Sequence, residues 1–568
     1  MIATNPAKRF FKLLNLDKQL IINIYVYAVF NGLIVLSLPL GIQAIINFVT
    51  GGQFTTSWFV LVFIIILGII VSGIMQIKQL SLAEDLQQKI FAHSAYEFTY
   101  RIPRLKRNDI EKHHLPELVN RFFDTISIQK GISKILLDFS RSLLQVLFGI
   151  ILLSLYHPFF ILYGIILLFL LIIIFRYTAP MGMQSSINES KYKYKLAHWM
   201  EEVARTFEGF KMAGNTKMPL NKSNEIVKNY LFHRKKHFKT LVLQYSVMVG
   251  FKVLIIGGLL ILGGILVINQ QMNIGQFVAS EIVIILLLNS IEKLILSFET
   301  IYDMLTSLDK IGYFTDLPLE NHDGLKIEQK KEGIALHFKN LNYTNSGNDM
   351  HIKNLNVNVK AGSKMAITGI NRSGKSLFLQ LAAGLYGNFE GTISYNNIPL
   401  GNIDIMNLRS SIGENIGHDL IFEGTLLENL TLGREQISQE EIEKVVDLVG
   451  LREFVENLHN GYHEILNSGG RRLPEGAAIK LVLARAFVHK PKLILLEDPF
   501  DAMDNESADR VIEYLQSEDL NATVIIAMKR RKYLKLMDEI IWMEDGMIKD
   551  IGHYNELRKN ADFTFMVK

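Results

Sequence analysis

Apolar residues are concentrated in the first 300 positions of the chain. A helix needs roughly 20 predominantly apolar residues to cross the hydrocarbon core of a bilayer, which is about 30 Å thick. Six stretches qualify: Leu20–Val49, Trp58–Met75, Ile135–Tyr156, Phe159–Phe175, Val247–Ile268 and Ile274–Phe298. The pattern therefore predicts an all-α transmembrane domain with six spans.

The distribution of basic residues indicates how these spans are oriented. The three short connections, TGGQFTTS, HP and NQQMN, contain no Lys or Arg, whereas segments 76–134 and 176–246 are rich in both. Cytoplasmic segments carry the excess of Lys and Arg, so both termini and both long segments are expected in the cytoplasm. Their helical patterning predicts long cytoplasmic extensions of the membrane helices. Short helices are expected in NDIEKHHLPELVNRF, from Asn108, and EEVARTFEGFKMAGN, from Glu201.

Ionisable side chains inside a bilayer are costly, so they usually face a cavity or one another. Lys252 and Glu281 are the predicted pore-facing pair, although a purely structural role is an equal alternative. Four further side chains near cytoplasmic span ends are explained more simply by extension to the membrane interface: Asp138, Arg141, Glu292 and Lys293.

The N-terminus and the composition add further limits. Residues 1–18 mix Lys and Arg with Phe and Leu, which predicts an interfacial amphipathic helix, with a frayed basic tail as the alternative. The 568-residue chain has a mean hydropathy of +0.20 and a net charge of only +4, which gives no case for nucleic-acid binding. The absence of cysteine excludes disulfides, thiolate metal sites and a cysteine nucleophile.

From about residue 333 the chain becomes polar, strand-rich and punctuated by glycine. The strand KMAITGI runs into GINRSGKS and then into the helical run LFLQLAAGL, which is the context required of a phosphate-binding loop. In such a loop, backbone N–H groups wrap the phosphates, the Lys reaches the β and γ oxygens, and the Ser hydroxyl binds Mg²⁺. An α/β P-loop domain that binds ATP and Mg²⁺ is therefore expected, through Gly369, Ile370, Asn371, Arg372, Ser373, Gly374, Lys375 and Ser376.

A second chemical signature is LILLEDPFDAMD, which ends at Asp504. Four apolar residues run into Glu497 and Asp498, as expected of a buried strand that delivers carboxylates to a phosphate-bound metal. Most ATPases with this layout place Asp first and Glu second, so the order is reversed here. Glu497 is still a suitable hard oxygen ligand for Mg²⁺, together with Ser376.

These features resemble ATP-binding cassette (ABC) transporters of the type I exporter family, as a half-transporter in which a membrane domain is fused to a nucleotide-binding domain. The resemblance covers nearly the whole chain. It assigns Tyr343 to adenine stacking, Glu497 to the metal and Asp498 to catalysis, and Asp504 ends the D-loop. The implied boundaries are 1–18 for the elbow helix, 19–310 for the transmembrane domain, 311–332 for a linker and 333–568 for the nucleotide-binding domain.

Several positions depart from the family's pattern. Gly417, followed by His418, stands where the family has its Q-loop glutamine, and Met528 stands in place of the switch histidine. Asp498 is one methylene shorter than Glu, and a misplacement of about 1 Å can cost on the order of 100-fold in rate. In place of the signature Leu-Ser-Gly-Gly-Gln, the chain has Leu473, Pro474, Glu475, Gly476 and Ala477.

The altered signature bears on hydrolysis because, in the family, this element caps the γ-phosphate across a dimer. Pro474 has neither a hydroxyl nor an N–H group, and Glu475 brings negative charge toward phosphate. A proline near a helix start is acceptable structurally, so the helix should persist while the phosphate contact weakens.

Two functions follow from the resemblance. In the first, the chain hydrolyses ATP slowly and exports a substrate such as a peptide or protein by alternating access. In the second, it is a nucleotide-gated, hydrolysis-impaired subunit of a mixed transporter or envelope complex. Either implies a homodimer, or a heterodimer with a second half-transporter, in the bacterial inner (cytoplasmic) membrane. The membrane half most resembles the bacterial type I secretion and peptide-export branch. Members of that branch commonly work with a periplasmic adaptor, so an adaptor is a further expected partner.

Overall fold

The computed structural model describes residues 6–52, 56–111, 115–328, 332–344, 351–417, 421–470, 473–501, 503–518 and 520–567. The chain divides into two compact units. The helical unit comprises residues 1–103 and 114–317, and the sheet unit comprises residues 104–113 and 318–568. The predicted order of a helical domain followed by an α/β domain is confirmed.

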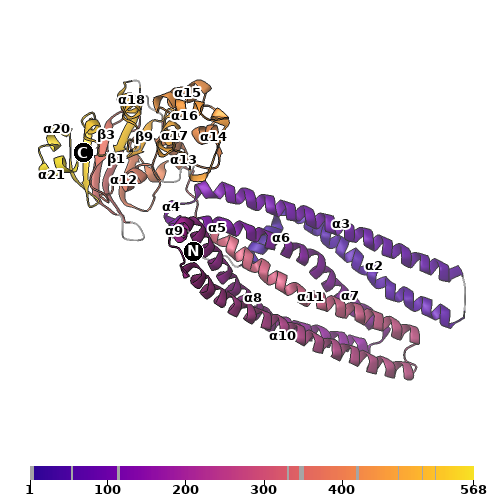
Figure 1. Cartoon of the computed structure of the whole chain (residues 1–568). Helices are drawn as coiled ribbons and strands as arrows, with labels where there is room; N and C mark the ends of the chain where they lie inside the picture. Colours follow the sequence, from indigo (N-terminus) through magenta and orange to yellow (C-terminus); the bar gives the residue numbers. More distant parts are fainter. Residues whose placement is uncertain are drawn as a thin grey trace. The chain divides into compact units, whose positions relative to one another are not determined.

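The helical unit consists of long helices joined by short turns (Figure 1). Its α-helices are α1 (Pro6–Leu14), α2 (Lys18–Thr50), α3 (Thr56–Arg101), α5 (Leu115–Asn120), α6 (Asp124–Lys134), α7 (Ser140–Tyr156), α8 (Phe159–Arg205), α9 (Phe207–Met212), α10 (Met218–Ile268) and α11 (Ile274–Thr315). A π-helical turn, Ile135–Phe139, joins α6 to α7.

Each predicted span lies within one continuous helical stretch. Among the described residues, five helical stretches are long and apolar enough to cross a membrane: Lys18–Thr50, Thr56–Arg104, Leu115–Tyr156, Met218–Ile268 and Ile274–Thr315. The remaining predicted span, Phe159–Phe175, lies inside the 47-residue helix α8. The helices extend well beyond the apolar stretches, which confirms the prediction of long helices.

Helix α11 forms the centre of the helical unit. It packs against α2, α6, α7, α8 and α10, while α2 lies along α3 and α8 lies along α10. Half of the apolar window of α11 is buried inside the unit, compared with 6% of the window of α3. The outward faces of the other helices are apolar and exposed, as expected of surfaces that contact lipid.

The N-terminal helix α1 is fixed to the end of α11. Arg9 donates from Nη1 to the carbonyl oxygens of Leu308, at 3.1 Å, and Asp309, at 3.0 Å. Its Nη2 donates to the carboxylate of Asp316 at 2.5 Å. Cations are favourable near the carbonyl end of a helix, which explains why a basic residue occupies this place. The interfacial location of α1 stays a prediction.

Short helices are present in both segments where they were expected. The first segment forms α4 (Arg107–Ile110) in the sheet unit and α5 in the helical unit, and the second forms the end of α8 and α9. Helix α11 continues to Thr315, and the sheet unit resumes at Pro318.

The sheet unit contains a six-stranded sheet in the order β12-β11-β3-β10-β9-β6 and a four-stranded sheet in the order β2-β1-β4-β5; β7 pairs with β8. The strands are β1 (Leu336–Thr344), β2 (His351–Val359), β3 (Lys364–Thr368), β4 (Glu390–Tyr395), β5 (Ile398–Pro399), β6 (Ile412–Glu414), β7 (Gly424–Thr425), β8 (Ile465–Leu466), β9 (Leu493–Glu497), β10 (Thr523–Ala527), β11 (Glu539–Glu544) and β12 (Met547–Gly552). Further α-helices are α12 (Lys375–Ala382), α13 (Ile405–Ser410), α14 (Leu426–Thr431), α15 (Gln439–Leu448), α16 (Arg452–Glu456), α17 (Glu475–Val488), α18 (Asn505–Gln516), α19 (Arg531–Leu534), α20 (Tyr554–Leu557) and α21 (Ala561–Met566).

The centre of the six-stranded sheet is parallel. Strand β10 pairs with β3 on one side and with β9 on the other, and β6 extends the sheet beyond β9. Parallel strands covered on both faces are apolar along their whole length, as KMAIT and LILLE are apart from their terminal residues. Because these strands run in one direction, the loops that follow β3, β9 and β10 meet at one edge of the sheet.

Candidate functional site

The predicted phosphate-binding loop joins β3 to α12, and its backbone requires two glycines. A Cβ atom on Gly369 would lie 2.3 Å from the carbonyl oxygen of Met543 and 2.5 Å from Ser373 Oγ. Gly374 has a φ of +102°, a conformation that costs L-residues free energy. The loop can therefore turn tightly from the strand into the helix only with glycine at these positions.

The loop presents groups that suit a phosphate. Lys375 is buried, and its Nζ donates to the carbonyl oxygens of Gly369, at 3.0 Å, and Ile370, at 3.1 Å. The buried Ser373 Oγ has no hydrogen-bond partner among the described residues. A small cavity of about 70 Å³ lies against this loop and is also lined by His351. A cation, a free hydroxyl and a helix N-terminus at one point fit an anionic ligand.

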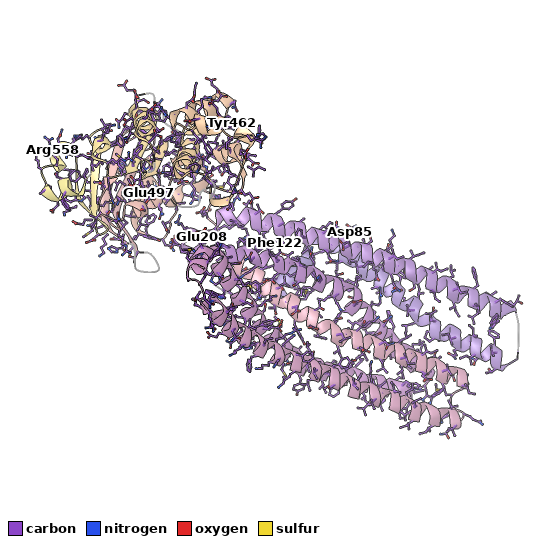
Figure 2. The ribbon with its side chains drawn as sticks, viewed as in Figure 1. Asp85, Phe122, Glu208, Tyr462, Glu497 and Arg558 are labelled. Atoms are coloured by element: carbon purple, nitrogen blue, oxygen red, sulfur yellow. The ribbon has the colours of Figure 1, made fainter. Side chains whose placement is uncertain are left out.

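The two predicted metal ligands meet beside this loop. Ser376 Oγ, in the first turn of α12, donates a hydrogen bond to the carboxylate of Glu497 at the end of β9. Glu497 is labelled in Figure 2. No group of three or more acidic, His or Cys side chains suited to a metal occurs in the part of the chain that the structure describes. Mg²⁺ characteristically takes few protein ligands and fills its shell with phosphate and water oxygens. The hydroxyl and carboxylate therefore fit Mg²⁺ bound with a nucleotide.

The second acid, Asp498, follows directly and has an unusual backbone conformation. Its φ is +39°, and its N–H donates to the carbonyl oxygen of Ala527 in β10 at 2.9 Å. Burial raises the pKa of the Asp498 carboxyl above its ordinary value, and the negative charge of Asp501 raises it further. The nearby Lys375 opposes this shift. A partly buried carboxylate with a raised pKa, next to the predicted metal ligands, has the properties of a general base.

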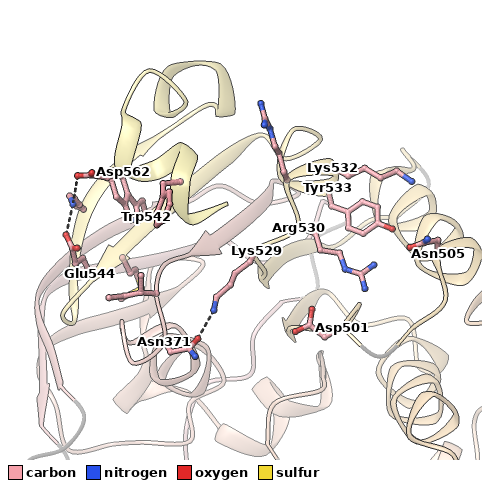
Figure 3. A pocket seen from close by; sticks show the side chains of 15 residues that line it. Asn371, Asp501, Asn505, Lys529, Arg530, Lys532, Tyr533, Trp542, Glu544 and Asp562 are labelled. Carbon is pink, nitrogen blue, oxygen red and sulfur yellow. Dashed lines mark hydrogen bonds and ion pairs between the residues drawn. The ribbon is translucent and has the colours of Figure 1, made fainter. Parts of the chain in front are cut away.

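Met528, at the position of the switch histidine, is buried, whereas its neighbour Lys529 extends to the phosphate loop. Met528 is 2% exposed and packs into the hydrophobic core beneath the sheet edge. Lys529 instead reaches the phosphate loop, where its Nζ donates to Asn371 Oδ1 at 2.6 Å (Figure 3). Burial lowers the pKa of Lys375, and the positive charge of Lys529 lowers it further. The sequence reasoning missed Lys529, although a cation two residues after the buried strand β10 was a visible signal.

Lys529 and Asn371 also line a cavity of about 1160 Å³, together with Asp501 and Arg530 (Figure 3). The cavity is continuous with the phosphate loop on one side and reaches Trp542 on the other. The cavity beside Ile370 and Asn371 is therefore lined by many polar and charged groups.

The altered signature begins a regular helix. Pro474 is exposed and is the N-cap of α17, and it provides no side-chain hydrogen bond to that helix. Ala477 N–H donates to the Pro474 carbonyl oxygen at 2.9 Å. Leu473 and Gly476 are half-buried, and the side chain of Glu475 lies outside what the structure describes. The helix thus persists after Pro474 as expected, and the effect on phosphate binding stays a prediction.

Asp504 has a clear structural role. Its Oδ1 accepts a hydrogen bond from the backbone N–H of Ser507 at 2.8 Å and so caps α18. Its Oδ2 accepts from Lys480 Nζ, on α17, at 2.7 Å. The hydrogen bond from Lys480 holds the pKa of Asp504 well below its usual range. Asp504 therefore ties the loop after Glu497 and Asp498 to the helix that begins after Pro474.

Tyr343, the predicted adenine-stacking residue, is only 5% exposed and packs against Tyr386 with ring centroids 4.9 Å apart. Tyr386 OH donates to the carboxylate of Glu111 at 2.5 Å, and the guanidinium of Arg107 lies 5.2 Å from the Tyr386 ring centroid. Burial, with the negative charge of Glu111, raises the pKa of Tyr343 to about 12. Tyr343 does not line the phosphate-loop cavity, whereas His351, on the adjacent strand β2, does. Adenine stacking by Tyr343 stays a prediction.

The region of the absent glutamine is partly described. Gly417 is exposed and has a φ of +118°, which favours glycine. His418 lies outside the described residues. Two positions earlier, Asn415 contacts Glu497 through its side-chain amide, a contact that the sequence reasoning missed.

In the helical unit, Lys252 and Glu281, the predicted pore-facing residues, do not form an ion pair with each other. Lys252 Nζ instead pairs with the carboxylate of Glu292. Lys252 lies 16 residues before Ile268, which ends α10, and Glu292 lies 18 residues after Ile274, which begins α11. At a rise of 1.5 Å per residue, Lys252 and Glu292 lie at nearly the same height along the paired helices α10 and α11. Glu281 lies about 14 Å away from Lys252 along the helix axis. Whether Lys252 and Glu281 face a pore stays untested.

Two family profiles match this chain. The profile of the ABC transporter transmembrane region matches residues 21–291, and the ABC transporter profile matches residues 352–501. The second range contains the phosphate loop, both acids and the altered signature.

Individual curated relatives are only about a quarter identical to this chain over the matched residues. The chain is 25% identical over 351 residues to a provisionally named export ATP-binding/permease protein of Rickettsia felis, covering 60% of this chain and 61% of that protein. It is 26% identical over 300 residues to the alpha-hemolysin translocation ATP-binding protein HlyB of Escherichia coli O157:H7, covering 52% of this chain and 42% of that protein. The chain thus spans less than two thirds of these curated relatives.

A solved structure of a bacterial Atm1-family ABC exporter with ATP bound has a similar fold. The TM-score is 0.86 with 17% sequence identity, and the match covers 97% of this chain and 98% of that chain. At this identity the likeness concerns the fold alone.

Proposed function

Because the chain belongs to the ABC transporter family, with a helical membrane region fused to an ATPase domain, we propose that it is the ATP-hydrolysing subunit of an exporter. The observation that carries the proposal is the meeting of Ser376 and Glu497 beside Lys375. These groups suit a metal-bound triphosphate at the edge of the parallel sheet. The Asp498 carboxylate, with its raised pKa, is the group available to polarise an attacking water.

The exporter would act as a dimer in the bacterial inner membrane. In ABC transporters the signature element of one cassette closes over the nucleotide of another, and closure drives the membrane helices between inward- and outward-facing states. Either a homodimer or a heterodimer with a second half-transporter satisfies this requirement. The likeness to an alpha-hemolysin translocation protein favours a peptide or protein substrate and a periplasmic adaptor as a further partner.

Hydrolysis would be slow. Pro474 offers no side-chain hydrogen bond at the start of α17, and Asp498 is shorter than the expected Glu by one methylene. Met528 is buried in the core, and its thioether has no hydrogen-bond donor to offer a γ-phosphate. Adenine would stack on Tyr343 after the ring moves from its place against Tyr386.

The same departures support a second function, in which ATP binding alone changes the conformation of the membrane helices. In this case the chain is a nucleotide-gated subunit of a mixed transporter or envelope complex. The groups suited to holding ATP, Lys375, Ser376 and Glu497, are all in place, while the altered groups are those expected to act in hydrolysis.

The steady-state ATPase rate of the full chain in lipid nanodiscs distinguishes the two functions. Lys375→Ala removes the phosphate-binding cation and sets the blank, and Lys360→Ala removes an exposed lysine of the same domain as the matched control. Hydrolysis predicts that the unmodified chain and Lys360→Ala exceed Lys375→Ala by the same factor. A rate equal to the Lys375→Ala blank, with retained binding of a fluorescent ATP analogue, would exclude hydrolysis and favour the gating function.

A further inference from the structure

The end of β6 carries a contact that the family resemblance does not assign. Strand β6 pairs with β9 in parallel, with Glu414 opposite Leu495. The next residue, Asn415, donates its backbone N–H to the Leu495 carbonyl oxygen at 3.3 Å. The chain then leaves the sheet, since Ile416 N–H bonds to the Glu414 side chain at 2.5 Å and Gly417 turns with positive φ.

The side chain of Asn415 continues the hydrogen bonding to β9 after the backbone of β6 has left the sheet. Its Oδ1 accepts a hydrogen bond from the backbone N–H of Glu497 at 2.7 Å. Its Nδ2 donates to the backbone carbonyl oxygen of the same residue at 3.1 Å. One carboxamide thus satisfies both backbone polar groups of Glu497 on this side, in the way that a peptide unit of a longer β6 would.

Glu497 is also fixed from its other side. It lies opposite Ala527 of β10, and the N–H of Asp498 bonds to the Ala527 carbonyl oxygen at 2.9 Å. The contacts on both sides fix the backbone of Glu497. From this backbone, the carboxylate accepts a hydrogen bond from Ser376 Oγ. Without Asn415, two partly buried backbone groups of Glu497 would lose their partners. Each such loss costs up to about 1–3 kcal/mol unless the backbone moves toward other partners.

We propose that Asn415 is a positioning residue for the metal site: its side-chain amide clamps the backbone of Glu497 and so aims the carboxylate at a metal shared with Ser376. In the ABC family the Q-loop glutamine contacts the metal directly, and Gly417 occupies its position here. The carboxamide of this chain lies two residues earlier and acts on the metal through Glu497. This inference rests on the proposed binding of a metal–nucleotide complex.

Metal affinity, measured without turnover, tests the clamp. Mn²⁺ replaces Mg²⁺, and its binding to the full chain in nanodiscs with ATP is followed by the loss of the free Mn²⁺ signal in electron paramagnetic resonance. Asn415→Leu keeps the approximate volume and removes both hydrogen bonds. We expect a 10- to 100-fold weaker affinity for Mn²⁺, the range typical of residues that orient a metal ligand. Affinity for a fluorescent ATP analogue in EDTA should change less than about twofold.

Two further variants separate positioning from a general loss of structure. Asn415→Gln retains the amide and should recover much of the Mn²⁺ affinity. Asn407→Ala is the matched control, because Asn407 Oδ1 also accepts a backbone N–H, that of Ile327 at 2.8 Å, away from the site. It should leave Mn²⁺ affinity unchanged. If Asn415→Leu does not fold, Asn415→Ala is measured in the same way.

The outcomes are distinguishable from failure of the proposed function. Unchanged Mn²⁺ affinity in Asn415→Leu would overturn the clamp while leaving nucleotide binding intact. Equal weakening of Mn²⁺ binding and of nucleotide binding in EDTA would also overturn it, since a general distortion would then be the cause. An unmodified chain that binds neither Mn²⁺ nor the ATP analogue would overturn both proposals.

Discussion

Replacing Asp498 tests the assignment of the catalytic base. The residue has a φ of +39°, a conformation that Asn tolerates about as well as Asp. Asp498→Asn therefore keeps the backbone and the side-chain shape, and it removes only the charge and the basicity. Asp498→Glu adds the missing methylene, but in this conformation a longer side chain costs about 1–2 kcal/mol.

The expected change in the ATPase rate of Asp498→Asn combines two effects. A positioned general base contributes about 10²- to 10⁴-fold to a rate. A carboxylate placed about 1 Å too far from the attacking water loses on the order of 100-fold of this rate contribution. Asp498→Asn should therefore lower the ATPase rate by about tenfold, which corresponds to about 1.4 kcal/mol in the activation barrier. Asp498→Glu should raise the rate, by up to about 100-fold where the backbone accepts it.

The assay is the ATPase rate of nanodisc-embedded protein as a function of pH, with Lys375→Ala as the blank. Because burial raises the pKa of Asp498 above 3.8, the rate of the unmodified chain should fall as the pH drops toward that raised pKa. An Asp498→Asn variant with the full rate at every pH would refute the assignment of Asp498 as the base.

The same pKa shift predicts an effect on stability. A raised pKa means that the folded protein disfavours the ionised carboxylate, so ionisation destabilises the fold at neutral pH. Asp498→Asn should therefore raise the thermal unfolding temperature at pH 7, and the difference should shrink as the solution is acidified. A lower unfolding temperature at pH 7 would show that the charge is better satisfied than its burial indicates.

Three more predictions concern other parts of the chain. Burial lowers the pKa of His489 to about 4 from 6.5, so acidification to pH 5 should destabilise the fold by about 2 kcal/mol; His489→Gln should abolish this loss in thermal unfolding. Lys252→Ala and Glu292→Ala should each lower the unfolding temperature, and exchanging the two charges should restore it, unless the ion pair forms only weakly. Tyr343→Ala should weaken binding of an ATP analogue by about 1–3 kcal/mol, Tyr343→Phe should not, and equal affinities in all three chains would exclude base stacking.

The contacts that span long sequence separations needed the tertiary structure. Asn415 and Glu497 are 82 positions apart, and Lys529 and Asn371 are 158 positions apart. Their meeting depends on which parallel strands are neighbours and on their register, and both are fixed by crossover connections that carry no local signal. Asn415 was visible as a polar residue at the end of an apolar strand, but its partner was not.

The burial of Tyr343 and the partner of Lys252 differ in how far the sequence could predict them. The position of Tyr343 against Tyr386 follows from packing between separate elements, so no pattern in the sequence predicts it. The partner of Lys252 was available from the sequence, because counting equal helical rises from the turn places Glu292 opposite. The cost of a charge in the bilayer indicates that it needs a partner, but its height along the paired helices indicates which residue that partner is.

The sequence by itself determined the six apolar spans, their helical extensions and the strand–loop–helix of the phosphate site. These features are local, since hydrophobic length and glycine conformation act over a few turns or residues. Only the tertiary structure decided that the carboxylate of Glu497 meets Ser376 and that the Asn415 amide hydrogen-bonds the backbone of Glu497. The physical reason is that a ligand set is defined by distances of about 3 Å between side chains, and those distances follow from strand order and register.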